Sequence, residues 1–218
     1  MNPCDNKLVI AIDGPSGSGK STIGKAVARW LDYLYIDSGA IYRAIGRKAI
    51  DTGTPLDDAA SLARLARESE VQLIGDPDHL RILLDGRDVT DEIRLPDASH
   101  ASSVVATLPE VREAVVDTLR EMARSGGVVM DGRDIGTKVF LDASPDVRAR
   151  RRFEEERERG RDVSVEAIRS ELEERDRRDR ERTATPLVKA PDAVFIDTSD
   201  MPLDGVIDHV LEIVRMRS

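Results

Sequence analysis

Cysteine is almost absent from this sequence, whose 218 residues include a single one, Cys4. A lone cysteine has no partner, which excludes a disulfide framework and a cysteine-based zinc site, and we expect a reducing cytoplasm as its compartment. Long hydrophobic runs are missing as well. None approaches the roughly 20 apolar residues that cross a bilayer, and residues 1–7 lack the apolar segment of a signal peptide. We therefore expect a cytoplasmic protein that is neither exported nor held in a membrane.

Excess positive charge and aromatic side chains are also scarce. The formal net charge is −9 and aromatic residues make up 3% of the chain. Broad nucleic-acid binding depends on a surplus of Lys and Arg, and single-strand binding adds stacked aromatic rings. The basic run 148–152 does not change this, because acidic residues at 154–156 and 158 can pair with it at helical spacing, and a solvated helix face explains most of these charges. We expect a small substrate and no nucleic acid.

Hydrophobic periodicity predicts an α/β fold in a single domain. Residues 7–13 suit a strand buried on both faces of a parallel sheet, and a helix at 20–31 with a strand at 35–37 completes a βαβ opening. After helices at 41–52 and 57–69 the period changes, and residues 71–84 predict a small inserted antiparallel hairpin. Further elements are expected as helices at 96–107 and 109–124, strands at 128–130, 139–141 and 193–196, two charged helices after Ser144 that flank a break at Gly160, and a C-terminal helix carrying Val206, Val210, Leu211 and Val214.

A phosphate-binding pattern follows the first predicted strand and opens the first predicted helix. Residues 14–21 match G-x-x-x-x-G-K-[ST], the P-loop motif, in the context that it requires. Backbone N–H groups converge on phosphate oxygens, Lys20 reaches the β and γ phosphates, and Ser21 offers a hydroxyl to Mg²⁺. A glycine-rich turn with an exposed lysine is the alternative, and motif and context together favour ATP or GTP binding. The residues expected at the nucleotide are Gly14, Pro15, Ser16, Gly17, Ser18, Gly19, Lys20, Ser21 and Thr22.

A second, acidic metal ligand is expected directly after a hydrophobic strand. Asp131 is in that position, because it follows the apolar residues Val128, Val129 and Met130. A turn residue at a strand end is its alternative interpretation. Ser21 and Asp131 are therefore the candidate Mg²⁺ ligands.

An acceptor site would separate a small-molecule kinase from an NTPase switch. Arg175, Asp179 and Arg182 lie at i, i+4 and i+7 of a predicted helix, so they share one face. Guanidinium forks suit a phosphate and a carboxylate suits sugar hydroxyls. Taken alone, the spacing is more typical of a salt-bridged surface.

Several short segments along the sequence form a set of motifs: residues 12–17 (IDGPSG), 37–43 (DSGAIYR), 91–94 (DEIR), 111–114 (VREA), 131–134 (DGRD), 174–176 (ERD) through Arg182, and 186–188 (PLV). By these segments, and along nearly its whole length, the chain resembles the bacterial cytidylate kinases. The resemblance implies a P-loop kinase that transfers the γ-phosphoryl group of Mg·ATP to CMP or dCMP.

The resemblance also implies roles for individual residues. Ser103, Arg112 and Asp134 would read the cytosine edge, Arg175 and Asp179 would hold the ribose, and Arg43, Arg133 and Arg182 would hold the acceptor phosphate. Ser38 and Tyr42 would line the same pocket, and Lys20, Arg133 and Arg182 would clamp the transferring group. Without the resemblance, Tyr42 reads as a core residue and Ser103 as a surface residue. A carboxylate accepting from the cytosine amino group, beside an arginine, would discriminate against uracil.

The same resemblance divides the chain into a core (1–37, 105–150 and 183–218), a monophosphate-binding insert (38–104) and a lid with acceptor-binding helices (151–182). The Arg-rich residues 150–163 are similar to the mobile lid. The expected fold is a P-loop NTPase-type parallel sheet flanked by helices, with the inserted hairpin subdomain and a helical lid. We expect a monomer. The alternatives are another P-loop small-molecule kinase, acting on UMP or AMP, and a non-catalytic nucleotide-binding regulator.

One departure from the family falls between the strand ending at Asp131 and the strand near Val139. Only residues 132–138 join them, whereas the relatives carry several more, and Val139-Phe140-Leu141-Asp142-Ala143 is similar to both halves of the longer stretch. Parallel crossovers that climb back along a strand take roughly 10 to 12 residues. We therefore expect a strained or displaced pocket edge at Arg133 and Asp134, with lowered cytosine selectivity and stability.

Overall fold

The computed structural model describes residues 7–132, 139–181, 187 and 189–216. Contacts divide the chain into two compact units: one holds Leu31–Val128 with the stretch up to Val9, and the other holds Ile10–Trp30 with the chain from Val129 onward. Each unit is described by itself. Among the described residues, no helix is both long and apolar enough to cross a membrane.

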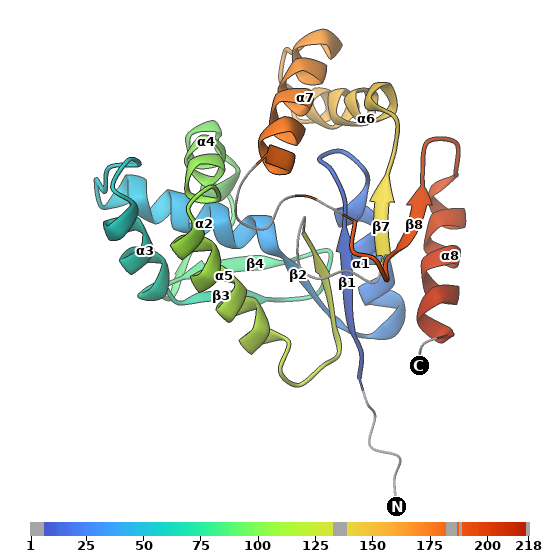
Figure 1. Cartoon of the computed structure of the whole chain (residues 1–218), viewed down its shortest axis with the longest axis horizontal. Coiled ribbons are helices and arrows are strands. Elements are labelled where there is room, and N and C mark those ends of the chain that lie inside the picture. Colours follow the sequence, from blue (N-terminus) through green and yellow to red (C-terminus); the bar gives the residue numbers. More distant parts are fainter. Residues whose placement is uncertain (1–6, 133–138, 182–186, 188, 217–218) are drawn as a thin grey trace, which may run out of the picture. The chain divides into compact units, whose positions relative to one another are not determined.

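The second unit contains four sheet strands in the order β6-β1-β7-β8. They are β1 (Val9–Asp13), β6 (Val128–Asp131), β7 (Val139–Asp142) and β8 (Val194–Asp197). β7 pairs in parallel with β1 and with β8 (Figure 1). β1, β6 and β7 are buried almost throughout, as expected of parallel strands covered on both faces. The predicted strands and the parallel sheet are confirmed.

Four helices belong to this unit: α1 (Lys20–Leu31), α6 (Pro145–Glu158), α7 (Val165–Glu181) and α8 (Leu203–Arg215). α6 starts as the sequence predicts, with Pro145 in its first turn and the Ser144 hydroxyl accepting from the Val147 N–H at 3.4 Å. α6 and α7 pack against each other (Figure 1). Their contact includes a buried apolar cluster of Ala149, Ile168 and Leu172.

The charged helix α6 corrects one expectation. Arg152 does pair at helical spacing, with Glu155 at 2.9 Å and with Glu156 at 3.0 Å. A solvated face is nevertheless wrong for Arg148 and Glu156, which are 4% and 5% exposed. Burial raises the pKa of Glu156, but the arginines around it, Arg152, Arg161 and Arg159, outweigh this and bring the pKa below its ordinary value.

The first unit contains β2 (Leu34–Asp37) and four helices, α2 (Ser38–Asp51), α3 (Ala59–Arg67), α4 (Pro96–Val105) and α5 (Pro109–Met122). The prediction placed the start of α2 three residues late. Asp37 caps the helix instead, because its carboxylate accepts a hydrogen bond from the Ala40 N–H at 3.1 Å.

A small antiparallel sheet completes the first unit, with β3 (Val71–Ile74), β4 (Arg81–Leu84) and the short β5 (Arg87–Asp88). The predicted hairpin is confirmed, with Val71 opposite Leu84, whereas β5 and a 3₁₀ turn at Glu92–Arg94 were not predicted. α2 and α4 pack closely because Gly46 has no side chain: a Cβ there would lie 2.8 Å from the Ser102 nitrogen.

The strand register bears on the short connector. The Leu8 carbonyl accepts from Val128 N at 3.3 Å and the Ile12 carbonyl accepts from Gly132 N at 3.0 Å, so β6 runs parallel to β1. Val139, the first residue of β7, is also in register with Ile12. Both described ends of the connector therefore lie at one level of the sheet, and the expectation that it climbs back along a strand is wrong. Residues 133–138 lie outside the described part of the chain.

Candidate active site

The phosphate-binding loop, residues 14–19, joins β1 to the first turn of α1 as the sequence predicts. Gly14 has φ of 151°, and a Cβ there would lie 2.0 Å from the Leu141 carbonyl oxygen, so no other residue fits beside β7. Lys20 Nζ donates to the Pro15 carbonyl at 2.7 Å, which places the ammonium group over the loop. The loop therefore combines a glycine-rich backbone, a helix N-terminus and a lysine, the features that bind phosphates.

The two predicted metal ligands come together in this unit. The Ser21 hydroxyl donates to Oδ2 of Asp131 at 2.6 Å, and Asp131 is 4% exposed at the end of β6. Within the described ranges, no three His, Cys, Asp or Glu side chains gather into a metal-binding group. Mg²⁺ requires no such group, since it is commonly held by one or two oxygen side chains together with substrate phosphates and water. The Ser21 hydroxyl and the Asp131 carboxylate, which are in contact, therefore fit Mg²⁺ as ligands.

Sequence reasoning missed three further side chains around the loop. Arg148 donates to the Ser16 carbonyl at 3.0 Å. Arg151 donates to the Oγ1 and the carbonyl oxygen of Thr198, at 3.0 and 2.8 Å, and its Nη1 lies 3.8 Å from where a Cβ on Gly19 would be. Thr198 directly follows β8, so the rule that ligands meet the carboxyl ends of parallel strands could have indicated it. The two arginines were hidden in a run that reads as helix surface.

The first unit holds five of the predicted acceptor residues. Ser38 begins α2 and is buried, and Arg43, one turn later, donates to Asp37 Oδ2 at 2.7 Å. Burial raises the pKa of the Asp37 carboxyl, but Arg43 and the N–H groups of Ala40 and Gly39 bring it below its ordinary value. Arg43 is therefore held in one position by an ionised partner.

Tyr42, Ser103 and Arg112 lie on three different helices of this unit. The Arg112 guanidinium is 5.6 Å from the centre of the Tyr42 ring, is 3% exposed, and donates to the Ala106 carbonyl at 3.0 Å. Tyr42 is half-buried rather than a full core residue. Ser103 Oγ donates to the Ser99 carbonyl of its own helix at 3.2 Å. The structure thus joins Tyr42 to Arg112 and leaves Ser103 bonded within α4.

The remaining acceptor residues belong to the second unit. Asp179 on α7 is 8% exposed and Arg175 is half-buried, so a salt-bridged surface does not describe Asp179. The predicted residues Arg133, Asp134 and Arg182 lie outside the described residues.

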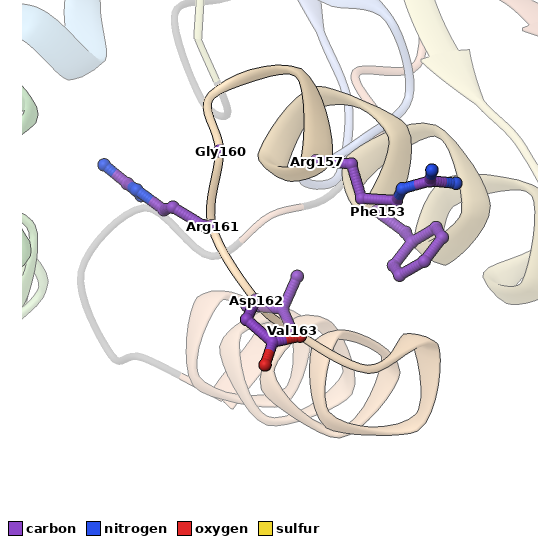
Figure 2. Close-up of a pocket in the computed structure, with 6 residues that line it drawn as sticks. All are labelled: Phe153, Arg157, Gly160, Arg161, Asp162 and Val163. Atoms are coloured by element: carbon purple, nitrogen blue, oxygen red, sulfur yellow. The ribbon is translucent and has the colours of Figure 1, made fainter.

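The turn between α6 and α7 belongs to the Arg-rich stretch 150–163. A pocket of about 330 Å³ lies there. It is lined by Phe153 and Arg157 from α6 and by residues 160–163 of the turn (Figure 2). The Arg157 guanidinium lies 5.6 Å from the centre of the Phe153 ring, and Arg161 is bound to Glu156 at 2.7 Å. No residue of the phosphate loop lines this pocket.

The chain is similar to proteins of one family along nearly its whole length. A family model described as cytidylate kinase matches residues 10–216. A cytidylate kinase from Pelotomaculum thermopropionicum is 50% identical over 211 residues, which cover 93% of each chain. Another from Bacillus velezensis is 44% identical over 222 residues, covering 98% of this chain and 99% of the relative. Among solved structures, an uncharacterized protein from Eubacterium ventriosum has a similar fold, with a TM-score of 0.52 at 13% identity and coverage of 97% of this chain and 99% of that one. The chain therefore belongs to the cytidylate kinase family and is an enzyme of the phosphotransferase class.

Proposed function

We propose that this enzyme transfers the γ-phosphoryl group of ATP to CMP or dCMP, with Mg²⁺ as the metal. The observation that carries the proposal is the contact of Ser21 with Asp131 at 2.6 Å beside a phosphate loop with its lysine, in a chain half identical to a cytidylate kinase. Mg²⁺, when bound, would neutralise charge on the phosphate oxygens.

In this proposal the chain's own residues supply positioning and charge. Phosphoryl transfer asks for little covalent help from protein, so no general base is assigned. Lys20 would hold the transferring phosphate, while Ser21 and Asp131 would hold the metal. The acceptor roles proposed are those of the family: cytosine for Ser103, Arg112 and Asp134, ribose for Arg175 and Asp179, phosphate for Arg43, Arg133 and Arg182, and the pocket wall for Ser38 and Tyr42.

Buried polar groups support the assignment of cytosine to Arg112. The guanidinium is 3% exposed and fixed by the Ala106 carbonyl and the Tyr42 ring, which lowers the entropy lost when it donates to a base carbonyl. A site of paired polar groups rejects a ligand that leaves them unpaired. CMP and dCMP should therefore be far better acceptors than UMP.

The test is coupled ADP release with CMP, dCMP, UMP, AMP and dTMP under Mg·ATP, repeated with excess EDTA. The expected result is ADP release that depends on CMP or dCMP and stops without divalent metal. Equal kcat/KM for CMP and UMP would contradict the proposed recognition of the cytosine base. Equal turnover with AMP would favour another P-loop kinase, and ATP binding without acceptor-dependent ADP release would favour a regulator.

We also propose that the enzyme works as a cytoplasmic monomer with small nucleotides as its only substrates, and that residues 38–104 and 151–182 act as monophosphate-binding insert and lid. Light scattering during size-exclusion chromatography tests the monomer. Its net charge of −9 supports the expectation that nucleic acid is not a partner.

A further inference from the structure

A buried arginine joins the phosphate loop to two other elements of the second unit. The side chain of Arg148 is 4% exposed. Its Nε donates to the Ala143 carbonyl at 3.0 Å, and its Nη1 donates both to the Ser16 carbonyl at 3.0 Å and to Asp176 Oδ2 at 2.6 Å. A charge removed from water is tolerated only when it is paired and hydrogen-bonded. Arg148 therefore has one arrangement that satisfies it, and that arrangement includes the loop.

The partner carboxylate is as deeply buried. Asp176 lies in the middle of α7 with its side chain 3% exposed. Its Oδ1 has no hydrogen-bond partner among the described residues. Asp176 directly follows Arg175 and comes three positions before Asp179, the two residues proposed to hold the ribose. A shift of Asp176 would therefore move both of them.

Stability alone does not explain this choice of residues. Replacing a buried ion pair by apolar side chains is often neutral or stabilising, because desolvation offsets the attraction. The same two helices use that apolar solution elsewhere, where Ala149 packs with Ile168 and Leu172. The charged pair occurs where α6 also meets the phosphate loop, since a Cβ on Gly17 would lie 3.1 Å from the Arg148 carbonyl oxygen.

We infer that Arg148 and Asp176 are positioning residues, which fix α7 relative to the phosphate loop so that phosphates held by the loop and ribose held by α7 meet in line. The inference rests on the proposed function for the roles of Arg175 and Asp179. Phosphoryl transfer depends on alignment, and a displacement of about 1 Å costs about 100-fold in rate. Loss of the pair should therefore lower turnover more than it weakens either substrate.

The experiment compares Asp176→Asn and Arg148→Lys with the wild type. Asparagine keeps the shape of Asp176 and removes its charge. Lysine keeps the charge of Arg148, but its single ammonium group cannot replace the separate Nε and Nη1 donors that reach the Ala143 carbonyl and Asp176 together. At a temperature where every variant is folded, kcat should fall about 10- to 100-fold, while KM for ATP and for CMP changes less than about threefold.

A matched control joins the same helices away from the loop. Arg169 on α7 donates to Asp146 on α6 at 2.6 Å, and these side chains are 49% and 72% exposed. Arg169→Lys and Asp146→Asn should leave kcat within about twofold, since exposed pairs contribute little. Lowered melting temperature with normal kcat in the Arg148 and Asp176 variants, or a raised KM for ATP at normal kcat, would overturn the inference.

Hydrogen exchange separates this inference from the proposed function. In Asp176→Asn, amide protection should fall both in α7 and in residues 16–21, whereas Asp146→Asn should leave the loop unchanged. This measurement needs no substrate, so it stands even if the wild type fails to phosphorylate CMP. If protection falls in α7 alone, Asp176 does not fix the loop and the inference is wrong. If Asp176→Asn does not fold, Arg148→Lys gives the same two readouts.

Discussion

The hydroxyl of Ser21 donates a 2.6 Å hydrogen bond to Oδ2 of Asp131, although the two residues are 110 positions apart. As both are candidate metal ligands, Asp131→Asn should raise the Mg²⁺ concentration for half-maximal activity about 10- to 100-fold. Excess Mg²⁺ should restore part of the rate. Activity titrated with MgCl₂ at saturating ATP and CMP measures this.

The chain offers a close control for that substitution. Asp197 also ends a strand and also accepts from a serine hydroxyl, Ser199 Oγ at 2.6 Å, but it is exposed at the end of β8. Asp197→Asn should leave the Mg²⁺ dependence unchanged. A similar shift in both variants would mean that the effect reflects strand ends in general and not a metal site.

Lys20 is expected to be needed for transfer and not for folding. Its ammonium group donates to the Pro15 carbonyl at 2.7 Å, within the phosphate loop itself, and it begins a helix whose apolar face is formed by other residues. Lys20→Ala should lower kcat about 10²- to 10³-fold, as the loss of one transition-state donor does. The melting temperature should stay within about 2 °C. Lys25→Ala, on the same helix, is the comparison that should keep full turnover.

The sequence predicted those parts of the molecule whose signal is local. The phosphate loop, the cap and proline that start α6, and the hairpin of β3 and β4 each depend on residues close together in the chain. It failed where the environment comes from distant residues. Arg148 and Glu156 look like a solvated helix face until α6 is packed. The start of α2 was misplaced because Asp37 was assigned to the preceding strand, while its carboxylate also caps the helix.

Acceptor binding should depend on Arg112 and not on charge alone. Arg112→Lys retains the positive charge but loses the fork that reaches the Ala106 carbonyl. Losing a charged hydrogen bond to the base should lower kcat/KM for CMP about 10- to 100-fold, with KM for ATP unchanged. Arg120→Lys on the same helix is the control, since Arg120 is 75% exposed. Normal CMP kinetics in Arg112→Lys would remove this arginine from the acceptor site.

The pH dependence of the free energy of unfolding should reveal the ion pair between Asp37 and Arg43. The folded-state pKa of Asp37 lies below its ordinary value of 3.8. The carboxylate therefore stabilises the fold above that value, and the contribution is lost as pH falls through the lower, folded pKa. Asp37→Asn keeps a capping side chain but removes the charge. Its free energy of unfolding in urea should lie below that of the wild type by a constant amount from pH 7 to pH 5.

The control for Asp37 is another helix cap. Asp58 caps α3 through the Ser61 N–H at 3.0 Å, and the hydrogen bonds from Ser61 lower the pKa of its carboxyl more than the nearby Arg64 does. Asp58→Asn should change stability less than Asp37→Asn at pH 7. As the pH falls below 3.8, the difference between the wild type and Asp37→Asn should shrink. A difference that grows toward acid would mean that the carboxylate is destabilising, contrary to its lowered pKa.

The connector between β6 and β7 yields the last prediction. Its ends, at Gly132 and Val139, share one level with Ile12, so it has to span two strand spacings, about 10 Å. Its seven residues, 132–138, reach about 23 Å when extended. Seven residues are therefore long enough to join the two strands without strain. Inserting Gly-Ser-Gly between Gly136 and Thr137 should not stabilise the protein, and the longer loop should cost about 0.3 kcal/mol of unfolding free energy.

Urea unfolding of the insertion variant beside the wild type makes that measurement. A gain in stability on insertion would show that the short connector does store strain. Selectivity is a separate question, because Arg133 and Asp134 lie in this segment and fewer residues are available to orient them. Lowered selectivity stays a prediction: the ratio of kcat/KM for CMP over UMP should be smaller than that of the Bacillus velezensis relative and should rise on insertion. A ratio as large as the relative's would show that seven residues suffice to place both side chains.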